Sequence, residues 1–423
     1  MSRRMSIPSG LDQADRALCA RLDADADAVI ARAIAWCAIN SGSRNLDGLR
    51  AMERPLVEAL GTLPGAVERL AMAPTSEVGN DGIVGAVEHG AALRLRVRPE
   101  APVQVALTGH YDTVYPAGTA FRDVTRTGDL LRGPGIADMK GGISVMLAAL
   151  AAFEAHPDAG RLGYTLLLSP DEETGSLASA PLLAQLGATA HVGMTYEPAL
   201  ADGTLVSARK GSGNFHVRVT GRAAHAGRDF ASGRNAVLAA AEIARALAAL
   251  NGRREGVTVN VARIDGGAAL NMVPDVAVVR FNARVPGMAD AMWLSDAIEE
   301  ALQAGRGDGL TAELHGGITR PPKPFVPAQQ RLFQAVRQIG ALIGQAIDWA
   351  PSGGVCEGNN LFAAGLPGID TLGVRGGEIH SEREHAFAAS FVERAQLSAL
   401  LLVRLANGTI DAPALRAGLD ETR

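Results

Sequence analysis

The sequence predicts an α/β protein in which a mixed sheet carries helices on both faces and a smaller α+β unit is inserted into the chain. Two observations support this fold class. Short apolar runs that end in polar residues alternate with alanine-rich segments in the first half of the chain and again near its end, as strands and their covering helices do. From residue 211 on, polar and apolar residues alternate, which is typical of strands with one buried face.

The first part of the chain is predicted to begin with helices. Residues 11–39 and 46–60 have apolar positions three and four residues apart, and a Ser-Gly-Ser break separates them. Strands are expected at residues 92–97, 103–108, 163–169 and 191–196, with an alanine-rich helix at 139–155.

The middle of the chain has a different order of elements. Strand 214–221, helix 235–250, strands 257–264 and 276–285, helix 288–304 and strand 311–315 follow one another. This β-α-β-β-α-β order is that of a ferredoxin-like sandwich. A proline-rich linker then leads to helix 329–343, strand 369–373 and helix 388–406. We therefore expect one domain formed by residues 1–209 and 320–423, interrupted by a second formed by residues 210–319.

The composition excludes several classes of protein. Of the 423 residues, 47% are hydrophobic and 20% are charged, which excludes a disordered or collagen-like chain. The net charge of −5 provides no basic footprint for nucleic acid or an anionic membrane surface, and charged residues interrupt the long apolar stretches. Cys19, Cys37 and Cys356 form no CxxC pair, and no secretory signal is recognisable. A cytoplasmic location is expected.

Acidic and imidazole side chains repeatedly follow predicted strands or lie in neighbouring loops. They are His110, Asp112, Asp138, Glu172, Glu173, Glu197 and His380. One such residue would be an ordinary solvated loop residue. Several together suggest a metal centre, because the ends of neighbouring strands converge and can bring ligands to within about 2 Å of an ion. Five ligands with one shared carboxylate would suit two ions about 3.5–4 Å apart.

Five segments in order resemble the motifs of the M20 metallopeptidase family. They are residues 109–114 (GHYDTV), 135–142 (GIADMKGG), 169–176 (SPDEETGS), 196–198 (YEP) and 376–381 (GGEIHS). The resemblance covers nearly the whole chain and is strongest to the glutamate carboxypeptidase and acetylornithine deacylase branch. It implies a zinc-exopeptidase type of fold, with the inserted unit as a lid and as the surface of a homodimer.

The resemblance also implies a set of metal ligands. Asp138 would bridge two divalent metal ions, most readily zinc, with cobalt or manganese as alternatives. One ion would also be bound by His110 and Glu197, and the other by Glu173 and His380.

Three further residues are expected to be catalytic by the same resemblance. Glu172 would not bind metal but would act as the general base that deprotonates water and later protonates the leaving amine. Asp112 would accept the second ring proton of His110 and so fix its tautomer. His225, in the segment RAAHAG, would reach the active site of the dimer partner and stabilise the oxyanion, although a histidine between alanines is more often merely packed.

Candidate substrate-binding residues follow from the same alignment of motifs. Asn271 and Arg284 match positions that contact the substrate carboxylate or the scissile carbonyl. Lys210 and Arg320 could also pair with a carboxylate, or they could be solvated surface charges.

Residues 353–359 (GGVCEGN) depart from the pattern of the carboxypeptidase branch. Cys356 and Glu357 are expected to line the pocket for the terminal carboxylate of the substrate. A negative charge on Glu357 would then disfavour an acidic group close to it.

The sequence therefore predicts a hydrolase that cleaves an amide bond in an N-acyl amino acid or a C-terminal dipeptide, and it leaves the choice between these two open. A carbamoyl-amide hydrolase is one alternative, although such relatives tend to carry His in place of Glu197. A catalytically silent ligand-binding relative is another, but it would lack the base or the ligands. No GxSxG, HExxH or GxGxxG motif favours a different chemistry.

Overall fold

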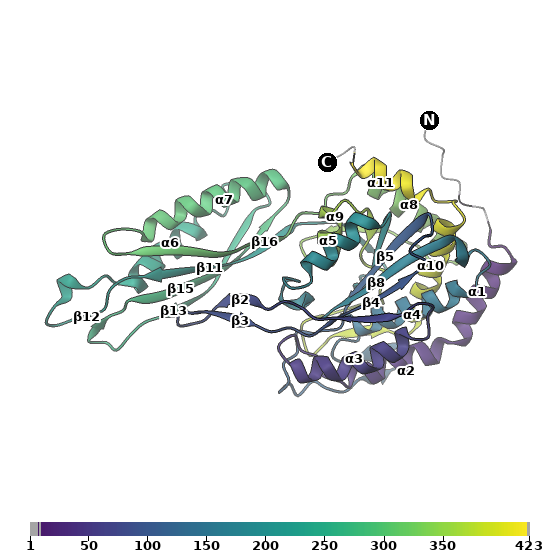
Figure 1. The fold of residues 1–423 in the computed structure, drawn as a ribbon, viewed down its shortest axis with the longest axis horizontal. Helices are drawn as coiled ribbons and strands as arrows, with labels where there is room; N and C mark the ends of the chain where they lie inside the picture. The colour runs from purple at the N-terminus through teal and green to yellow at the C-terminus, as the bar shows by residue number, and fades with distance from the viewer. Residues whose placement is uncertain (1–6, 8–9, 421–423) are drawn as a thin grey trace.

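The larger of two structural units is built on a six-stranded sheet (Figure 1). The computed structural model describes residues 7 and 10–420. The order of the strands in the sheet is β1 (Val67–Leu70), β4 (Ala92–Val97), β8 (Leu162–Ser169), β5 (Val103–His110), β9 (Val192–Thr195) and β18 (Gly368–Ile369). Strands β8, β5, β9 and β18 are parallel, whereas β4 is antiparallel to both of its neighbours.

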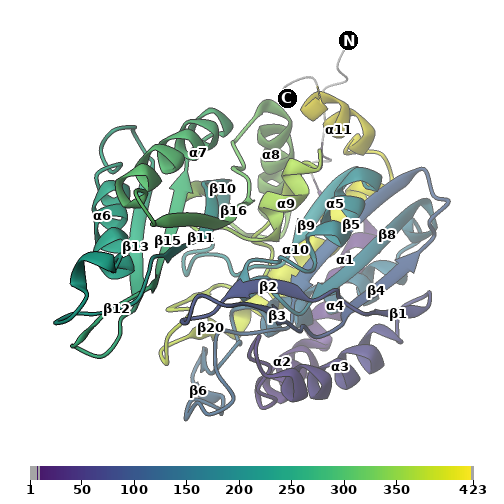
Figure 2. The same cartoon turned by 60° about the vertical axis from the view of Figure 1, so that its left-hand side comes forward.

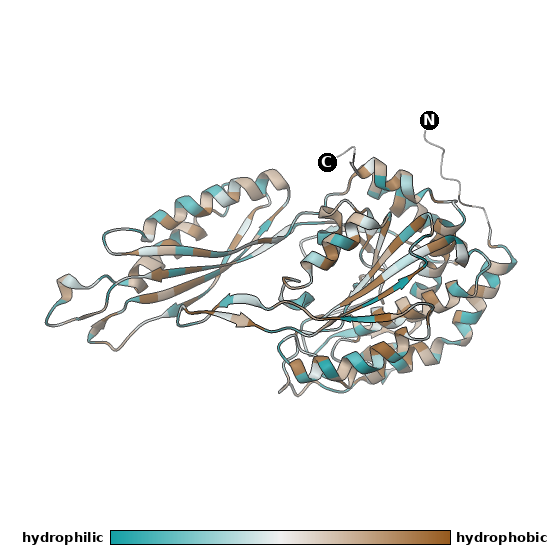
Figure 3. Ribbon diagram, viewed as in Figure 1, coloured by the Kyte–Doolittle hydropathy of each residue, from teal (hydrophilic) through white to brown (hydrophobic). Residues whose placement is uncertain are grey.

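Helices cover both faces of this sheet, which confirms the predicted α/β class. On β5, Val105 and Leu107 belong to a core shared with α4 and α10, whereas Ala106 packs with Leu183 of α5 and Leu361 of α9. Apolar residues accordingly concentrate between sheet and helices (Figure 3). The helices of this unit are α1 (Gln13–Ala24), α2 (Ala26–Cys37), α3 (Leu46–Leu60), α4 (Lys140–Glu154), α5 (Ala180–Thr189), α8 (Pro327–Leu342), α9 (Glu357–Ala363), α10 (Ala389–Ala406) and α11 (Ala412–Asp420).

The prediction of a single helix at residues 11–39 is wrong in one respect. It consists of α1 and α2, and Asp25 between them has left the helical conformation with φ −88° and ψ 0°. Aspartate favours helix ends over helix interiors because its side chain competes for backbone groups. The helix therefore changes direction at this residue.

The inserted unit has the predicted ferredoxin-like arrangement. Its antiparallel sheet has the order β13 (Thr258–Gly266), β15 (Val276–Val285), β11 (Gly211–Thr220) and β16 (Thr311–Arg320). Helices α6 (Ala236–Ala248) and α7 (Met288–Leu302) share its core, in which the rings of Phe215 and Phe281 stack at 4.8 Å. A short ladder of β12 (Ala224–His225) and β14 (Met272–Val273) forms the end of this unit that is farthest from the larger one (Figure 1).

Strand β16 is five residues longer than the predicted strand 311–315. It continues past Gly316, whose φ of +95° lets its backbone lie against Asn214 where a side chain would clash. Its pairing with β11 runs on to Ser212 and Arg320. The last residue of the inserted sheet, Arg320, therefore lies at the larger unit.

An unpredicted hairpin of β2 (Thr75–Val78) and β3 (Val84–Val87) reaches from the larger unit to the inserted one (Figures 1 and 2). Arg280 of β15 donates to Val78 O at 2.8 Å and to Asn80 Oδ1 at 3.0 Å. The remaining strands are β6 (Thr125–Thr127), β7 (Leu130–Arg132), β10 (Leu205–Arg209), β17 (Trp349–Ser352), β19 (Gly376–Gly377) and β20 (His385–Phe387). Within the described residues, no helix is long and apolar enough to cross a bilayer.

Candidate metal centre and active site

Three parallel strands end at the same edge of the large sheet and bring candidate ligands together. His110 is the last residue of β5, Glu173 lies in a 3-10 turn after β8, and Glu197 follows β9. The hydroxyls of Thr108 and Thr195 are 2.7 Å apart and join β5 to β9 next to this edge. The carboxyl ends of parallel strands are the usual place for a ligand in such a sheet.

Two groups of three side chains share Asp138 at this edge. One consists of His110, Asp138 and Glu197, the other of Asp138, Glu173 and His380, and within each group the candidate ligand atoms lie within 4.8 Å of one another. Asp138 Oδ1 is 3.0 Å from His110 Nε2, and its Oδ2 is 3.2 Å from His380 Nε2. These are the same two ligand sets that the family resemblance implies.

The charges of this cluster perturb one another strongly. Burial, and then the neighbouring Asp138, raise the pKa of Glu173 to about 8 and the pKa of Glu197 well above its ordinary value. Burial alone would raise the pKa of Asp138, but hydrogen bonds from His110 and His380 lower it. The same contacts with Asp138, and then Glu173, raise the pKa of His380 to about 11. Protons on these side chains reduce the repulsion among the carboxylates, and a divalent cation bound to them could do the same.

Two buried oxygen atoms that accept no hydrogen bond fit such cations. Oε1 of Glu173 and Oε1 of Glu197 are buried and have no hydrogen-bond partner among the described residues. A buried carboxylate oxygen without a partner is costly, and binding a cation would remove that cost. Imidazole and carboxylate together suit zinc, cobalt and manganese, so the residues present fit two divalent ions.

Asp112 joins the candidate metal ligand His110 to the turn that carries Glu172 and Glu173. Its carboxylate accepts the backbone N–H groups of Glu172 and Glu173 at 3.1 and 3.2 Å and the hydroxyl of Ser43 at 2.7 Å. It also lies 3.3 Å from His110 Nδ1, but the better-aligned partner of that nitrogen is the main-chain carbonyl of Asp112, at 3.1 Å. Both acceptors leave Nε2 of His110 as the ligand atom.

Glu172 faces a different partner from its neighbour Glu173. Arg320, which is 2% exposed, donates from Nη2 to Glu172 Oε1 at 2.6 Å and to its carbonyl at 2.9 Å. The two glutamates diverge because both lie in a 3-10 turn, in which successive residues are rotated by about 120°.

A cavity of about 520 Å³ opens beside these residues, between the two units. Its lining includes Glu172 and four of the five candidate metal ligands, which are Asp138, Glu173, Glu197 and His380. Further polar side chains that line it include Arg209, Asn282, Arg284 and Arg320. Lys210 does not line it, and its Nζ donates to Gly256 O at 2.6 Å. The fifth ligand, His110, is fully buried behind the cavity wall.

His225 and Asn271 lie together at the tip of the inserted unit, away from this cavity. His225 forms part of β12, and the carbonyl of Asn271 accepts the N–H of Ala226 at 2.8 Å. Both residues are exposed, and neither lines the cavity of its own chain. The chain does not bring them to the metal ligands.

The expectation that Cys356 and Glu357 line the substrate pocket is wrong. Both are 1% exposed and neither reaches the cavity. The thiol of Cys356 caps the N-terminus of α9, and the carboxylate of Glu357 turns inward to the hydroxyl of Ser169. Burial raises the pKa of Glu357 to about 8, so it carries a proton at neutral pH.

Several residues near the site were not predicted from the sequence. Arg209 lines the cavity and pairs with Asp370, which also accepts a hydrogen bond from Lys323 at 2.8 Å. Although burial would raise it, these two cations lower the pKa of Asp370 to about 2. Glu384 accepts backbone N–H groups from the segment that carries Asp138. No spacing or motif distinguishes these charges from solvated loop residues.

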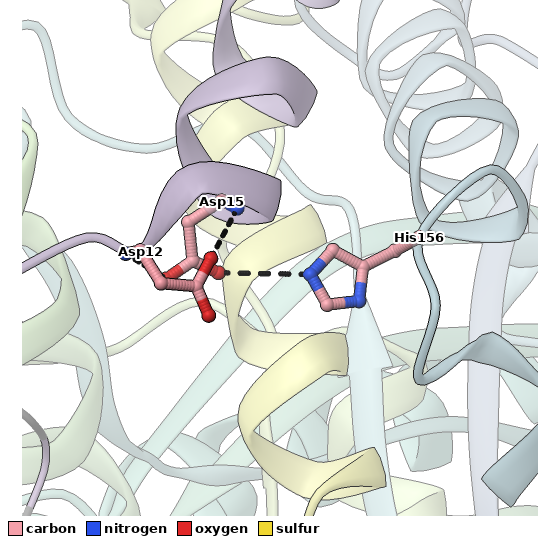
Figure 4. A group of neighbouring side chains, drawn as sticks. All are labelled: Asp12, Asp15 and His156. Atoms are coloured by element: carbon pink, nitrogen blue, oxygen red, sulfur yellow. Dashed lines mark hydrogen bonds and ion pairs between the residues drawn. The ribbon is translucent and has the colours of Figure 1, made fainter.

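A third group of candidate ligands consists of Asp12, Asp15 and His156 (Figure 4), and none of the three lines the cavity. Asp12 and Asp15 cap α1 reciprocally, and both oxygens of Asp15 accept from Arg404. Nδ1 of His156 accepts the N–H of Asp158 at 3.2 Å, so in the neutral ring Nε2 carries the proton and cannot bind a cation. This group is a helix cap joined to a buried ion pair.

Comparison with known proteins finds one peptidase family. Residues 106–404 match the model of peptidase family M20/M25/M40. The chain is similar to carboxypeptidase G2 of Pseudomonas sp. (strain RS-16), with 25% identity over 379 residues that cover 88% of this chain and 87% of the relative. It is also similar to a succinyl-diaminopimelate desuccinylase of Halorhodospira halophila, with 30% identity over 305 residues that cover 66% of this chain and 78% of the relative.

The fold has close counterparts among solved structures. An M20 family metallo-carboxypeptidase of Sulfolobus solfataricus superposes with a TM-score of 0.68 at 14% identity, over 94% of this chain and 100% of the other. At this level of identity, the likeness shows the fold alone.

Proposed function

Because this chain belongs to peptidase family M20/M25/M40, we propose that it is a metal-dependent hydrolase that cleaves an amide bond in an N-acyl amino acid or a C-terminal dipeptide. The observation that carries this proposal is the pair of three-ligand groups that share Asp138 beside the cavity. Two divalent ions bound there would polarise the scissile carbonyl and activate water. We propose zinc as the native ion, with cobalt or manganese as alternatives.

Glu172 is the proposed general base. It belongs to neither three-ligand group, yet it lines the same cavity. Arg320 occupies its Oε1, so we assign the proton transfer to Oε2, which would take a proton from water and deliver it to the leaving amine. Asp112 holds the backbone of this turn in place through the N–H groups of Glu172 and Glu173.

Arg284 is the strongest candidate for binding the substrate carboxylate. It lines the cavity, and its contacts are a 3.0 Å bond to Asn282 and a 3.5 Å contact with Gly353 O. The guanidinium of Arg320 is already bonded to Glu172, Ser176 and Asn360. We therefore assign Arg284 to the carboxylate, which a guanidinium can bind through two parallel bonds, and Arg320 to the orientation of Glu172.

We further propose that the enzyme is a homodimer that pairs through the inserted unit, which would act as a lid. His225 and Asn271 lie outside the cavity of their own chain, and a second chain would allow them to act at its active site. A cytoplasmic location is also proposed, because the three cysteines are free thiols.

One activity panel tests the proposed reaction. Metal-free protein would be loaded with zinc, cobalt or manganese and offered N-acyl amino acids, C-terminal dipeptides and a carbamoyl amino acid. We expect metal-dependent release of free amine from members of the first two classes. Release from the carbamoyl substrate alone would replace this proposal with the ureido hydrolase, and no release from any substrate would refute it.

A further inference from the structure

Glu384 is buried beneath the two loops that carry Asp138 and His380. It is 1% exposed and lies four residues after His380. Its Oε1 accepts the N–H groups of Ala137 at 2.9 Å and Asp138 at 3.0 Å. Its Oε2 accepts the N–H of Gly135 at 3.0 Å and the hydroxyl of Tyr115 at 2.6 Å. Each oxygen is thus matched by two donors.

The main chain of Glu384 is tied to the same segment. Its carbonyl accepts the N–H of Gly133 at 3.2 Å, and the next residue begins β20, which pairs with β7. The loop that carries His380 and the segment that leads to Asp138 are therefore joined by both the backbone and the side chain of one residue. A displacement of either would break several hydrogen bonds at once.

We propose that Glu384 is a positioning residue that fixes segment 135–138 and so presents the carboxylate of Asp138 to both metal ions. It does not belong to either three-ligand group, and it acts through the backbone of the residue that both groups share. This inference rests on the proposed function only in taking Asp138 as a metal ligand.

The Tyr115 hydroxyl also donates to Ser381 O at 2.8 Å. A carboxylate is nevertheless needed here, because the other three of its four partners are backbone N–H groups that can only donate and that contact both oxygens. An amide of the same shape would place an NH₂ group against two of them. It would face either the N–H groups of Ala137 and Asp138 or the N–H of Gly135 and the hydroxyl of Tyr115. Only that hydroxyl can turn round and accept, so at least one backbone N–H would lose its partner and the segment would have to move.

Glu384→Gln tests this role, with Glu382→Gln as the matched control, because Glu382 lies in the same loop and is exposed. Zn²⁺ and Mn²⁺ affinities would be measured by competition with a chelator on the full chain. We expect Glu384→Gln to weaken metal binding by roughly 10- to 100-fold, the usual cost of losing a residue that orients a ligand, and the control to leave it unchanged. A folded Glu384→Gln variant that binds both ions within threefold of the wild type would overturn the proposal.

Hydrogen exchange of the metal-free wild type provides a second test that does not depend on a variant folding. The amides of Gly135, Ala137 and Asp138 should be among the slow-exchanging loop amides, because Glu384 holds all three. Exchange as fast as in an exposed loop would refute the role. Metal binding is measured separately from turnover. If Glu384→Gln loses metal while the metal-loaded wild type cleaves no panel substrate, the positioning role is supported and the proposed reaction is refuted.

Discussion

Adjacent glutamates have different surroundings at this site, and those surroundings suit the two different roles that are proposed for them. Burial and Asp138 raise the pKa of Glu173 to about 8, which suits a side chain whose negative charge would be stabilised by a bound cation. Glu172 is held by Arg320, which suits a base whose free oxygen must point at water. A third glutamate, Glu357, lies behind them and keeps its proton at neutral pH because burial raises its pKa to about 8. The site therefore contains fewer negative charges than its count of carboxyl groups suggests.

Glu357 makes the stability of the protein depend on pH. The folded state holds this proton up to a pKa of about 8, whereas the ordinary pKa is 4.5. The free energy of unfolding should therefore fall as the pH rises through this window. Glu357→Gln removes the titration, so the stability of the wild type relative to this variant should drop by more than about 1 kcal/mol between pH 5 and pH 8.

Urea unfolding of metal-free protein at several pH values measures this difference. Glu100→Gln serves as the control, because Glu100 is exposed, and it should track the wild type throughout. A constant difference between the wild type and Glu357→Gln from pH 5 to pH 8 would show that Glu357 is ionised in the folded protein.

Among the helices and strands, the buried parallel strands and the residues at their ends could be predicted from the sequence. Buried parallel strands appear as continuous apolar runs, so the sequence alone could place His110 and Glu173 at one sheet edge. The alternating pattern after residue 210 likewise predicted the inserted sandwich. The hairpin of β2 and β3 was missed, because its strands are four residues each and mostly exposed. Glu384 and Asp370 were missed because their buried partners lie far away in sequence.

The hairpin is expected to restrain the inserted unit through Arg280. Its Nη2 donates to Val78 O and Asn80 Oδ1, while its Nε pairs with Asp265. Each hydrogen bond contributes about 0.5–1.5 kcal/mol, so Arg280→Ala should speed hydrogen exchange in residues 75–87 by roughly tenfold. Arg263→Ala is the matched control, since Arg263 also pairs with Asp265. Equal exchange in the Arg280 variant and the wild type would show that the hairpin holds its position without this arginine.

At the scale of the whole molecule, the active cavity depends on two units and, by proposal, on two chains. The larger unit supplies the proposed metal ligands, and Arg284 and Arg320 reach the cavity from the inserted sheet. Strand β12, which ends in His225, lies at the other end of that unit (Figure 1). The motif made His225 a candidate, but the sequence could not show that the residue lies outside the cavity of its own chain, because that depends on how the two units are arranged.

Mixed dimers test whether His225 acts in the partner chain. His225→Ala and Glu172→Gln should each be nearly inactive alone. When the two variants are unfolded together and refolded, half of the dimers should be mixed, and each mixed dimer should hold one complete site. Activity should then recover to about one quarter of the wild-type value. No recovery in verified mixed dimers would show that His225 has no role across the interface.

Glu172 is proposed to act as the general base beside metal ions that it does not bind. Metal content and turnover, measured on the same preparations of wild type and Glu172→Gln, separate these two properties. We expect about two ions per chain in both proteins and a turnover that is lower in the variant by roughly 10²- to 10⁴-fold. Undiminished turnover in Glu172→Gln, or loss of its metal together with its activity, would show that Glu172 is not the general base.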